Sequence, residues 1–404
     1  MFSEFDVIPT IIGILFLVLP AMLLGRLCAH YKISEVIGFV VAGVILGPFA
    51  LGGIIPFFDK PIFVINDFMM GFWQMSGIII LFSAGLHFTF NDLRKAGYKA
   101  AIIGITGVLI PLFLGYYVSS LFGFEWTVSV LIGATLSATS IAIAVIILEE
   151  LRKEKTTEGN ILVNAAVLDD VLGLAILSAV ISVITINSLP SLESIALITV
   201  EAIGFWFIIL IASVYFLPKL VHITTSAAPS PLESRGINQG VALGSAFGLA
   251  AIASALSLNP IVGAFAAGMG LAGSKLAIHV RDFVGRLKVI LAPLFFGLIG
   301  AHVDLSKIFE IDGIFFIAML AIAVLSKILG CGLPGVALLK NKTKGLRIGY
   351  GMIARGEVAF ITAGIGLTFG VLTSEIYSTL IFVILATILI SPTMLRKSFQ
   401  KSID

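Results

Sequence analysis

Charged residues are scarce in this sequence. Only 12% of its 404 residues are Asp, Glu, Lys or Arg, whereas about 25% is usual in a soluble protein. Hydrophobic residues make up 59%, and the mean hydropathy is +1.13. Apolar stretches of about 20 residues, each long enough to cross a bilayer, recur along the chain. We therefore predict a polytopic membrane protein without a large soluble domain. The net charge of +2 comes from nearly balanced totals, so no nucleic acid partner is expected.

Cysteine is also scarce. Cys28 and Cys331 are far apart and have no paired spacing, so neither a thiolate metal site nor a disulfide framework is expected. The first apolar run follows Glu4 and Asp6 and lacks the basic region of a cleaved signal peptide, so we interpret it as a span. The loops contain no pattern of metal ligands or nucleophiles. The sequence therefore predicts neither an enzyme nor a resident cofactor.

Hydrophobic segments predict an all-α membrane protein with about 13 transmembrane helices. Their starts lie near Val7, Ser34, Asp67, Tyr98, Trp126, Glu158, Glu193, Gly236, Pro260, Phe283, Ile311, Gly345 and Glu375. An odd number of spans places the two termini on opposite sides of the membrane. With thirteen spans, 21 of the 25 lysines and arginines fall on the side of the C-terminus. Lys60 and Lys307 fall on the opposite side. Because cytoplasmic loops are enriched in Lys and Arg, the N-terminus is predicted outside and the C-terminus in the cytoplasm.

Weak internal similarity predicts an inverted repeat. Residues 37–47 (IGFVVAGVILG) resemble residues 262–272 (VGAFAAGMGLA), and the third and tenth spans each end in Gly-x-His, at His87 and His302. Spans seven apart run in opposite directions, so spans 2 to 6 would be related to spans 9 to 13. Chance similarity between Gly/Ala segments is the alternative. Inverted repeats are typical of secondary transporters, whose sites lie near the bilayer midplane at broken helices.

The repeat predicts interruptions in the fifth and twelfth spans. Residues 135–142 (TLSATSIA) are dense in hydroxyls, which can bond backbone carbonyls and unwind a helix. Residues 349–360 (GYGMIARGEVAF) contain three glycines and two charges near mid-span. Ordinary packing of small residues between helices is the alternative. It is weaker for the twelfth span, because packing does not require Arg355 and Glu357.

Five ionisable residues lie well inside predicted spans: Asp169, Asp170, Lys327, Arg355 and Glu357. Such residues usually face the bundle interior and mark ion or proton pathways. Three acids against two bases leave one carboxylate for which H⁺ and a small cation could compete. Neighbours on a helix point about 100° apart, so one aspartate can meet Lys327 while the other faces a cavity. A static cap or ion pair is the alternative. For Arg355 and Glu357, neutralisation of the broken helix ends is the favoured interpretation.

Taken together, these motifs resemble the monovalent cation/proton antiporter superfamily, in the branch of the NapA-like and Kef-like transporters. The resemblance covers essentially the whole chain. It rests on five segments: GFVVAGVILGP (38–48), ATSIAIAVI (138–146), VLDDVLGL (167–174), LSKILGCGLPG (325–335) and GMIARGEVAFI (351–361). It implies an inverted-repeat antiporter fold with two crossing broken helices, and a homodimer in the lipid bilayer.

The resemblance also implies roles for single residues. Asp170 would be the main cation and proton carrier, and Asp169 would form a salt bridge with Lys327, as in family members that look electrogenic. Thr139 and Ser140 match the crossing region that helps to coordinate the ion. Asp170 and Asp169 would thus be the ligands of the transported Na⁺ or K⁺.

A division into subdomains follows from the same resemblance. The dimerisation subdomain would span roughly residues 1–90 and 236–305, and a linker helix would span roughly 193–220. The core that translocates the ion would span roughly 98–187 and 311–395. This core is expected to move against the dimerisation subdomain.

The predicted function is secondary antiport of Na⁺ or Li⁺ against H⁺ by alternating access in the inner cell membrane, with net charge movement. A K⁺/H⁺ antiporter of the Kef type is one alternative. It would lack the nucleotide-binding regulatory domain, because the chain stops about ten residues after the last span and has no GxGxxG after a strand. A cation channel is a further alternative, although no loop resembles a selectivity filter.

Overall fold

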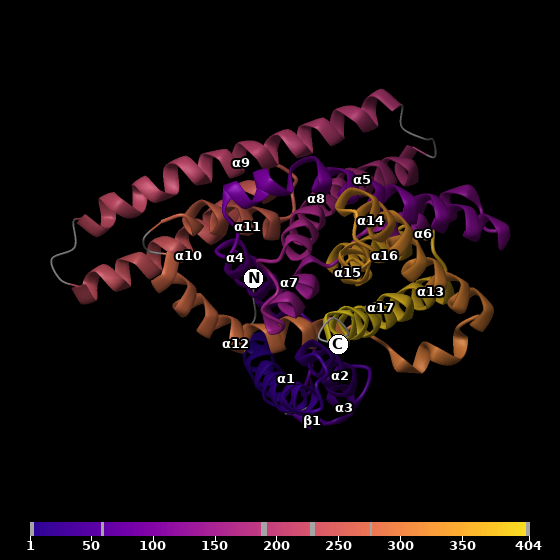
Figure 1. Cartoon of the computed structure of the whole chain (residues 1–404). Coiled ribbons are helices and arrows are strands. Elements are labelled where there is room, and N and C mark those ends of the chain that lie inside the picture. Colours follow the sequence, from indigo (N-terminus) through magenta and orange to yellow (C-terminus); the bar gives the residue numbers. More distant parts are fainter. Residues whose placement is uncertain (1–3, 58–59, 187–191, 227–230, 275–276, 401–404) are drawn as a thin grey trace.

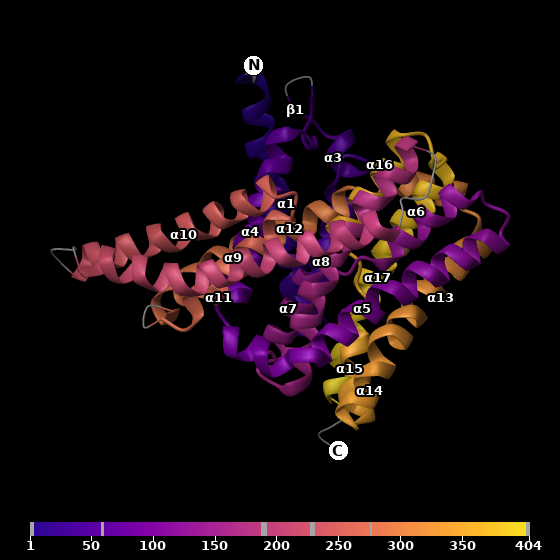
Figure 2. The ribbon, with the colours of Figure 1, turned by 90° about the horizontal axis from the view of Figure 1, so that it is seen from above.

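The structure is a computed structural model, in which almost every described residue is helical (Figure 1). The only sheet among the described residues is an antiparallel pair of short strands, β1 (Pro56–Phe57) and β2 (Lys60–Pro61). The first helix begins at one extreme of the molecule and the last helix ends at the opposite extreme, as the marks N and C in Figure 2 show. The structure describes residues 4–57, 60–186, 192–226, 231–274 and 277–400.

The helices of the first part of the chain have these bounds: α1 (Glu4–His30), α2 (Glu35–Leu46), α3 (Leu51–Ile54), α4 (Asp67–Gly85), α5 (Phe90–Leu121), α6 (Trp126–Ser137), α7 (Ile141–Glu150), α8 (Thr157–Ile186) and α9 (Leu192–Ser226). Those of the second part are α10 (Pro231–Ala255), α11 (Pro260–Ala272), α12 (Ala277–Ala301), the 3-10 helix η1 (Leu305–Glu310), α13 (Gly313–Lys327), the π-helix η2 (Ile328–Gly332), α14 (Leu333–Leu339), α15 (Lys342–Gly351), α16 (Glu357–Thr368) and α17 (Ser374–Gln400).

The predicted fold class is confirmed. Ten helical segments in the described part of the chain are long and apolar enough to cross a membrane, and two further apolar helices, Pro260–Ala272 and Val358–Thr368, are shorter. Each predicted span coincides with one helix or with two or three consecutive helices; the eleventh span coincides with α13, η2 and α14. The number of thirteen spans stays a prediction.

One helix begins well before its predicted start. Helix α5 begins at Phe90 rather than near Tyr98, because Thr89 and Asp92 form a capping box. The Asp92 N–H donates to Thr89 Oγ1 at 3.2 Å, and the Thr89 N–H donates to the Asp92 carboxylate at 2.9 Å. Hydropathy detects only the apolar part of a helix, so it missed this polar first turn. A kink at Gly97, with φ of +51°, separates that turn from the apolar part.

Both predicted interruptions are present, and they cross. Helix α6 ends at Ser137 and α7 begins at Ile141, whereas α15 ends at Gly351 and α16 begins at Glu357. The Ser140 N–H donates to the carbonyl of Ala354 at 2.8 Å. A Cβ atom placed on Gly356 would lie 2.7 Å from Ser140 Cβ, so only glycine permits this approach.

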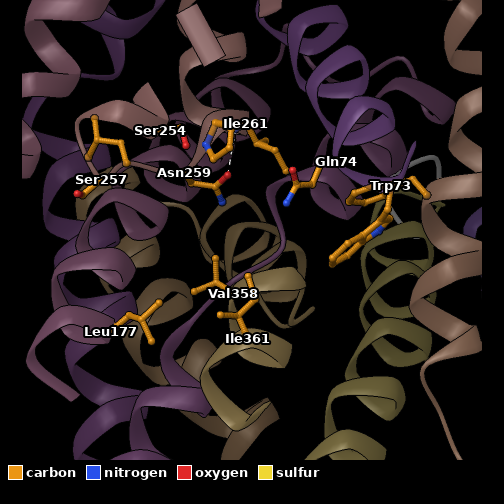
Figure 3. A pocket seen from close by; sticks show the side chains of 12 residues that line it. Trp73, Gln74, Leu177, Ser254, Ser257, Asn259, Ile261, Val358 and Ile361 are labelled. Atoms are coloured by element: carbon orange, nitrogen blue, oxygen red, sulfur yellow. Dashed lines mark hydrogen bonds between the residues drawn. The ribbon is translucent and has the colours of Figure 1, made fainter. Parts of the chain in front are cut away.

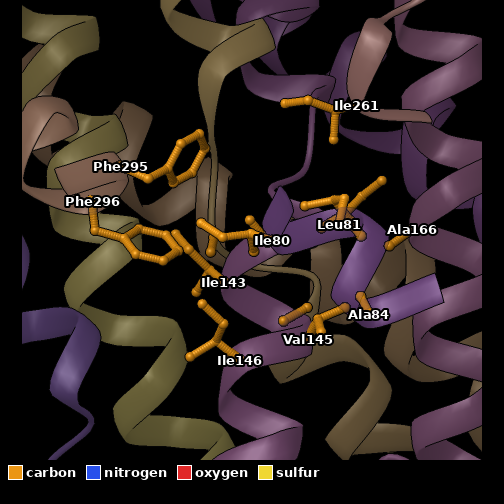
Figure 4. Packing of buried hydrophobic residues seen from close by; sticks show 14 of the residues in the cluster. Ile80, Leu81, Ala84, Ile143, Val145, Ile146, Ala166, Ile261, Phe295 and Phe296 are labelled. Atoms are coloured by element: carbon orange, nitrogen blue, oxygen red, sulfur yellow. The ribbon is translucent and has the colours of Figure 1, made fainter. Parts of the chain in front are cut away.

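The helices form two groups that meet at α7. One group contains α1, α2, α4, α11 and α12, and the other contains α5, α6, α8, α13 and α15 to α17. Helix α7 packs against α8 and α17 of the second group and against α4 of the first. Figure 4 shows Ile143 and Ile146 of α7 beside Ile80 of α4 and Phe296 of α12. This buried apolar contact sets the position of the fifth span's second half against the neighbouring group.

Close helix approaches within the first group depend on glycine. A Cβ atom on Gly43 of α2 would lie 1.7 Å from the carbonyl oxygen of Gly297 in α12. A Cβ atom on Gly85 of α4 would lie 2.2 Å from the carbonyl oxygen of Phe265 in α11. Such contacts are typical of membrane helices, which associate by close packing because lipid gives little hydrophobic driving force between them. Helices α9 and α10 pack on each other along one edge (Figure 1).

Candidate functional site

A fully buried ion pair joins α8 to the end of α13. Lys327 Nζ donates to Asp169 Oδ1 at 2.8 Å, and both side chains are 0% exposed. The same ammonium group donates to the carbonyl oxygen of Gly107 in α5 at 2.6 Å. A buried ion pair is tolerated only with good geometry and further hydrogen bonds, and the Gly107 carbonyl supplies one of them. The contact between Asp169 and Lys327 expected from the sequence is therefore present.

Local backbone features let Lys327 reach its two acceptors. A Cβ atom on Gly107 would lie 2.5 Å from Cys331 Sγ, so a larger residue could not bring α5 this close. Beyond Lys327 the chain forms the π-helix Ile328–Gly332, a rare widened turn that is frequent at functional sites. Thr106 Oγ1 donates to the carbonyl oxygen of Gly330 in that turn at 2.5 Å. Sequence reasoning missed these contacts.

Asp170 lies next to Asp169 on α8 and is 3% exposed. Helix α8 packs against α6, α7, α15 and α16, so it borders both interrupted spans. In the first interruption, the hydroxyl oxygens of Thr139 and Ser140 are buried and have no hydrogen-bond partner among the described residues. A buried hydroxyl without a partner costs about 1–3 kcal/mol. Oxygens of this kind, at broken helices beside a carboxylate, are suited to bind a small cation.

Arg355 lies in the second interruption and is fully buried. Its guanidinium donates to the carbonyl oxygens of Met352 at 3.3 Å and Ala323 at 2.9 Å, and its backbone N–H donates to Thr387 Oγ1 at 3.1 Å. Met352 follows the last residue of α15, where the helix dipole is negative. A cation there compensates that end of the broken span. Glu357 begins α16, but its side chain lies outside the part that the structure describes.

A cavity of about 320 Å³ lies between the two helix groups (Figure 3). Trp73 and Asn259 line it from the first group, and Leu177 of α8 and Val358 of α16 line it from the second. Leu177 comes seven residues after Asp170, about 10 Å farther along α8. The cavity is therefore on the C-terminal side of the aspartate pair.

Charged contacts close the other end of α7 and α8. Lys288 of α12 donates to Glu149 at the end of α7. Glu150 accepts from Ser34 Oγ at 3.0 Å and from Arg396 at 3.2 Å. Helix α7 is thus tied to α2 and α12 on one side and to α17 on the other. We name these contacts the inner cluster.

His87 belongs to the inner cluster and carries little positive charge near neutral pH. Its Nδ1 atom lies 3.3 Å from Glu149 Oε1. Burial, together with the neighbouring cations Arg281, Lys288 and Lys155, lowers the pKa of the His87 imidazole to about 4. Burial also lowers the pKa of His302, the other histidine of the Gly-x-His motifs.

The crossing of two broken helices beside buried carboxylates and a buried lysine defines a secondary transporter of the membrane. The family described as "Sodium/hydrogen exchanger, transmembrane" matches residues 14–401, and the chain belongs to this family. Because the family is one of transporters, the prediction that the chain is not an enzyme is confirmed. The resemblance to the cation/proton antiporters is confirmed as well.

Two relatives and one solved structure are similar over nearly the full length. The Na(+)/H(+) antiporter of Enterococcus hirae is 30% identical over 395 residues, which cover 96% of this chain and 98% of that protein. The Na(+)/H(+)-K(+) antiporter GerN of Bacillus cereus is 28% identical, over 95% of this chain and 94% of GerN. The sodium proton antiporter MjNhaP1 of Methanocaldococcus jannaschii shares the fold, with a TM-score of 0.71 and 16% identity over 98% of this chain and 99% of that one.

Proposed function

We propose that this chain exchanges Na⁺ for H⁺ by alternating access, with Asp170 as the carboxylate for which the two ions compete. The observation that carries this proposal is the arrangement on α8. The Asp169 carboxylate is neutralised by Lys327 at 2.8 Å, while the adjacent Asp170 adds a second buried carboxylate on a helix that packs against both interrupted spans. Relatives named Na(+)/H(+) antiporters support the choice of ions.

Charge balance at Asp170 explains why this carboxylate would bind either Na⁺ or H⁺ but not both. A carboxylate at membrane depth is costly when it is ionised, and either one proton or one monovalent cation compensates its charge. Asp170 would hold the cation together with the oxygens of Thr139 and Ser140, and Asp169 would complete the site when its bond to Lys327 breaks. Arg355 would stay in place and compensate the end of α15, with Glu357 as the corresponding acid at the start of α16.

Lys327 would make the exchange electrogenic. If a cation or proton takes Asp169, the ammonium group keeps its bond to the Gly107 carbonyl, 2.6 Å away. A buried lysine that loses its carboxylate partner releases a proton readily, because desolvation disfavours its charged form. The lysine could then contribute a second transported proton.

The two helix groups support a division into moving parts. We propose a core of roughly residues 98–187 and 311–395, a linker helix of roughly 193–220, and a dimerisation subdomain of roughly 1–90 and 236–305 that forms a homodimer. The cavity in Figure 3 lies between the core and the dimerisation subdomain, whereas the inner cluster joins them at the other end. This arrangement corresponds to one of the two access states.

We further propose that the chain lies in the inner cell membrane with its N-terminus outside and its C-terminus in the cytoplasm. The distribution of Lys and Arg supports this orientation. The cavity then opens toward the outside, and the inner cluster closes the cytoplasmic side. No resident cofactor is expected, because Na⁺ and H⁺ are the cargo.

Proton flux in proteoliposomes tests this function. Vesicles with an acidified interior receive Na⁺, Li⁺ or K⁺, and proton efflux is followed with and without a clamped membrane potential. We expect Na⁺-driven efflux that Asp170→Asn abolishes and that Asp67→Asn, a change at an exposed aspartate of α4, leaves intact. Retained exchange in Asp170→Asn would refute the assignment of the carrier. Preference for K⁺ would favour the K⁺/H⁺ alternative, and cation flux without proton flux would indicate a channel.

A further inference from the structure

A second cavity lies away from the ion site, on the surface where α5, α8 and α9 meet. Helices α5 and α9 both pack against α8. They leave a groove of about 460 Å³ between them, which we name the α5–α8–α9 groove. Its volume is in the range of small-molecule pockets. Apolar side chains dominate its lining, among them Ile105, Leu168, Leu172 and Phe207, and Arg94 is the one charged residue that lines it in the part of the chain that the structure describes.

The groove is open to the membrane. Ile105 is 47% exposed and Phe207 is 38% exposed, although both belong to segments apolar enough to span a bilayer. The lining positions on α5 extend from Phe90 through the kink at Gly97 to Ile105, so they belong to both the polar and the apolar part of this helix. Lipid chains are the apolar molecules that such a membrane-facing groove meets.

A backbone kink brings a cation to one end of this groove. Gly97 lines the groove and has φ of +51°, a conformation that glycine adopts without strain. A Cβ atom there would meet no atom within 4 Å, so the groove is hollow beside the kink. The polar first two turns of α5, with Arg94, are thereby displaced from the apolar length of the helix. Arg94 thus lines the groove from the polar side of the kink, and Ile105 lines it from the apolar side.

Arg94 is available to a ligand from outside the chain. It is exposed and forms no ion pair among the described residues. The nearest acid in sequence, Asp92, is already engaged by Thr89 and by Lys155, 3.4 Å away. A guanidinium holds a phosphate through two parallel hydrogen bonds. On the side of the membrane that we predict to be cytoplasmic, anionic lipids attract basic residues near the bilayer surface.

We propose that the α5–α8–α9 groove binds an anionic phospholipid, with one acyl chain along the groove and the phosphate held by Arg94. The acyl chain would pack against Leu168 and Leu172, which flank Asp169 and Asp170 on α8. A bound lipid would therefore support the helix that carries the proposed ion site. Binding itself does not depend on transport, so it can be tested separately.

The test uses the full-length protein in a neutral detergent and measures lipid retention by native mass spectrometry. Phosphatidylglycerol is compared with phosphatidylcholine of the same chains, and palmitate serves as an anionic amphiphile without a phosphate. We expect phosphatidylglycerol to be retained preferentially. Arg94→Gln should weaken its retention about tenfold, as expected for the loss of a charge-assisted contact. Ala101→Phe, which fills the groove, should also displace it.

Two control variants distinguish lipid binding at the α5–α8–α9 groove from the loss of any exposed cation and from the loss of transport. Lys342→Gln removes another exposed cation, at the start of α15, and should retain phosphatidylglycerol like the unmodified chain. Asp170→Asn should retain it as well, even if it cannot transport, so a failure of the proposed function would not affect this result. Undiminished retention by Arg94→Gln would overturn the proposal. Equal retention of phosphatidylcholine, or of palmitate, would overturn the assignment to an anionic phospholipid.

Discussion

The Asp169–Lys327 pair and the inner cluster place the same kinds of charges in different surroundings. Asp169 and Lys327 are both 0% exposed, whereas the side chains of Glu149 and Lys288 are 14% and 22% exposed. In the first pair, both side chains are fully buried, and Lys327 bonds only Asp169 and the Gly107 carbonyl among the described residues. In the inner cluster, several cations and the solvent share the carboxylates. The comparison indicates that the charges of the interior pair depend on each other, so one changes only when an ion or a proton compensates the other, and that the inner cluster is a contact that can open.

The largest effect is expected from removing one member of the interior pair. Asp169→Leu leaves Lys327 buried without its carboxylate, which should lower the free energy of unfolding by about 3–5 kcal/mol. Replacing both residues, as Asp169→Leu with Lys327→Met, should recover most of this loss, because no unpaired charge remains. Thermal unfolding in detergent gives the coupling energy of the double-mutant cycle. A double variant less stable than Asp169→Leu would contradict the expected coupling.

Transport by the Lys327→Met variant tests the role of the interior pair in charge movement. Lys327→Met removes the proton that we assign to electrogenic exchange, so Na⁺/H⁺ exchange should slow and no longer respond to a clamped potential. Asp169 would then be neutralised by a proton or by the cation itself. The measurement is proton flux in proteoliposomes at several membrane potentials. Full electrogenicity in this variant would show that the lysine has no such role.

An intermediate loss of stability is expected from a change at Gly107, where α5 approaches the π-helix η2. Gly107→Ala places a Cβ atom 2.5 Å from Cys331 Sγ, which should cost about 1–3 kcal/mol by overpacking. Cys331→Ala in the same chain removes the opposing sulfur atom and should relieve most of this cost. Unfolding temperatures of the two single variants and the double variant test the expectation. If the second change brings no recovery, the contact is not the cause.

A smaller effect on stability is expected from the inner cluster. Glu149→Gln removes a partly exposed ion pair with Lys288, so it should cost about 1 kcal/mol or less. It should nevertheless loosen α7 from α12 and favour the state that is open at this end. A thiol introduced as Ile146→Cys, one turn earlier on α7, should then react faster with a polar maleimide. Equal reaction rates with and without Glu149→Gln would argue against opening at this place.

Near neutral pH the smallest effect on stability is expected from His87, whose contribution changes only as the pH falls. Its pKa is about 4 in the folded protein and near 6.5 when unfolded, so the unfolded chain binds more protons between these values. The stability contribution is present above pH 6.5 and is lost as the pH falls toward 4. His87→Gln should therefore flatten the unfolding temperature between pH 6.5 and 4, relative to the unmodified protein. An identical pH profile would exclude the histidine as the cause.

Sequence patterns were sufficient for the features that depend on local composition. Apolar runs predicted the helices, the hydroxyls of residues 135–142 and the glycines of residues 349–360 predicted the interruptions, and buried charges indicated where to look for a site. The start of α5 was predicted eight residues late, because its cap and kink are polar. The number of spans, the homodimer, the subdomain boundaries and the roles of the site residues stay predictions.

By itself, the sequence determined that this is a helical membrane protein with functional charges inside its spans, because the cost of charge in a bilayer restricts where Asp169, Asp170 and Lys327 can occur. The antiporter type followed from the resemblance of its motifs to that superfamily. The tertiary structure decided which groups meet. Lys327 reaches Gly107, 220 positions away, and Glu149 meets Lys288, 139 positions away. No local sequence pattern encodes such contacts, because they depend on how the helices pack. The contact of Lys327 with Gly107, for example, requires a glycine where α5 approaches Cys331.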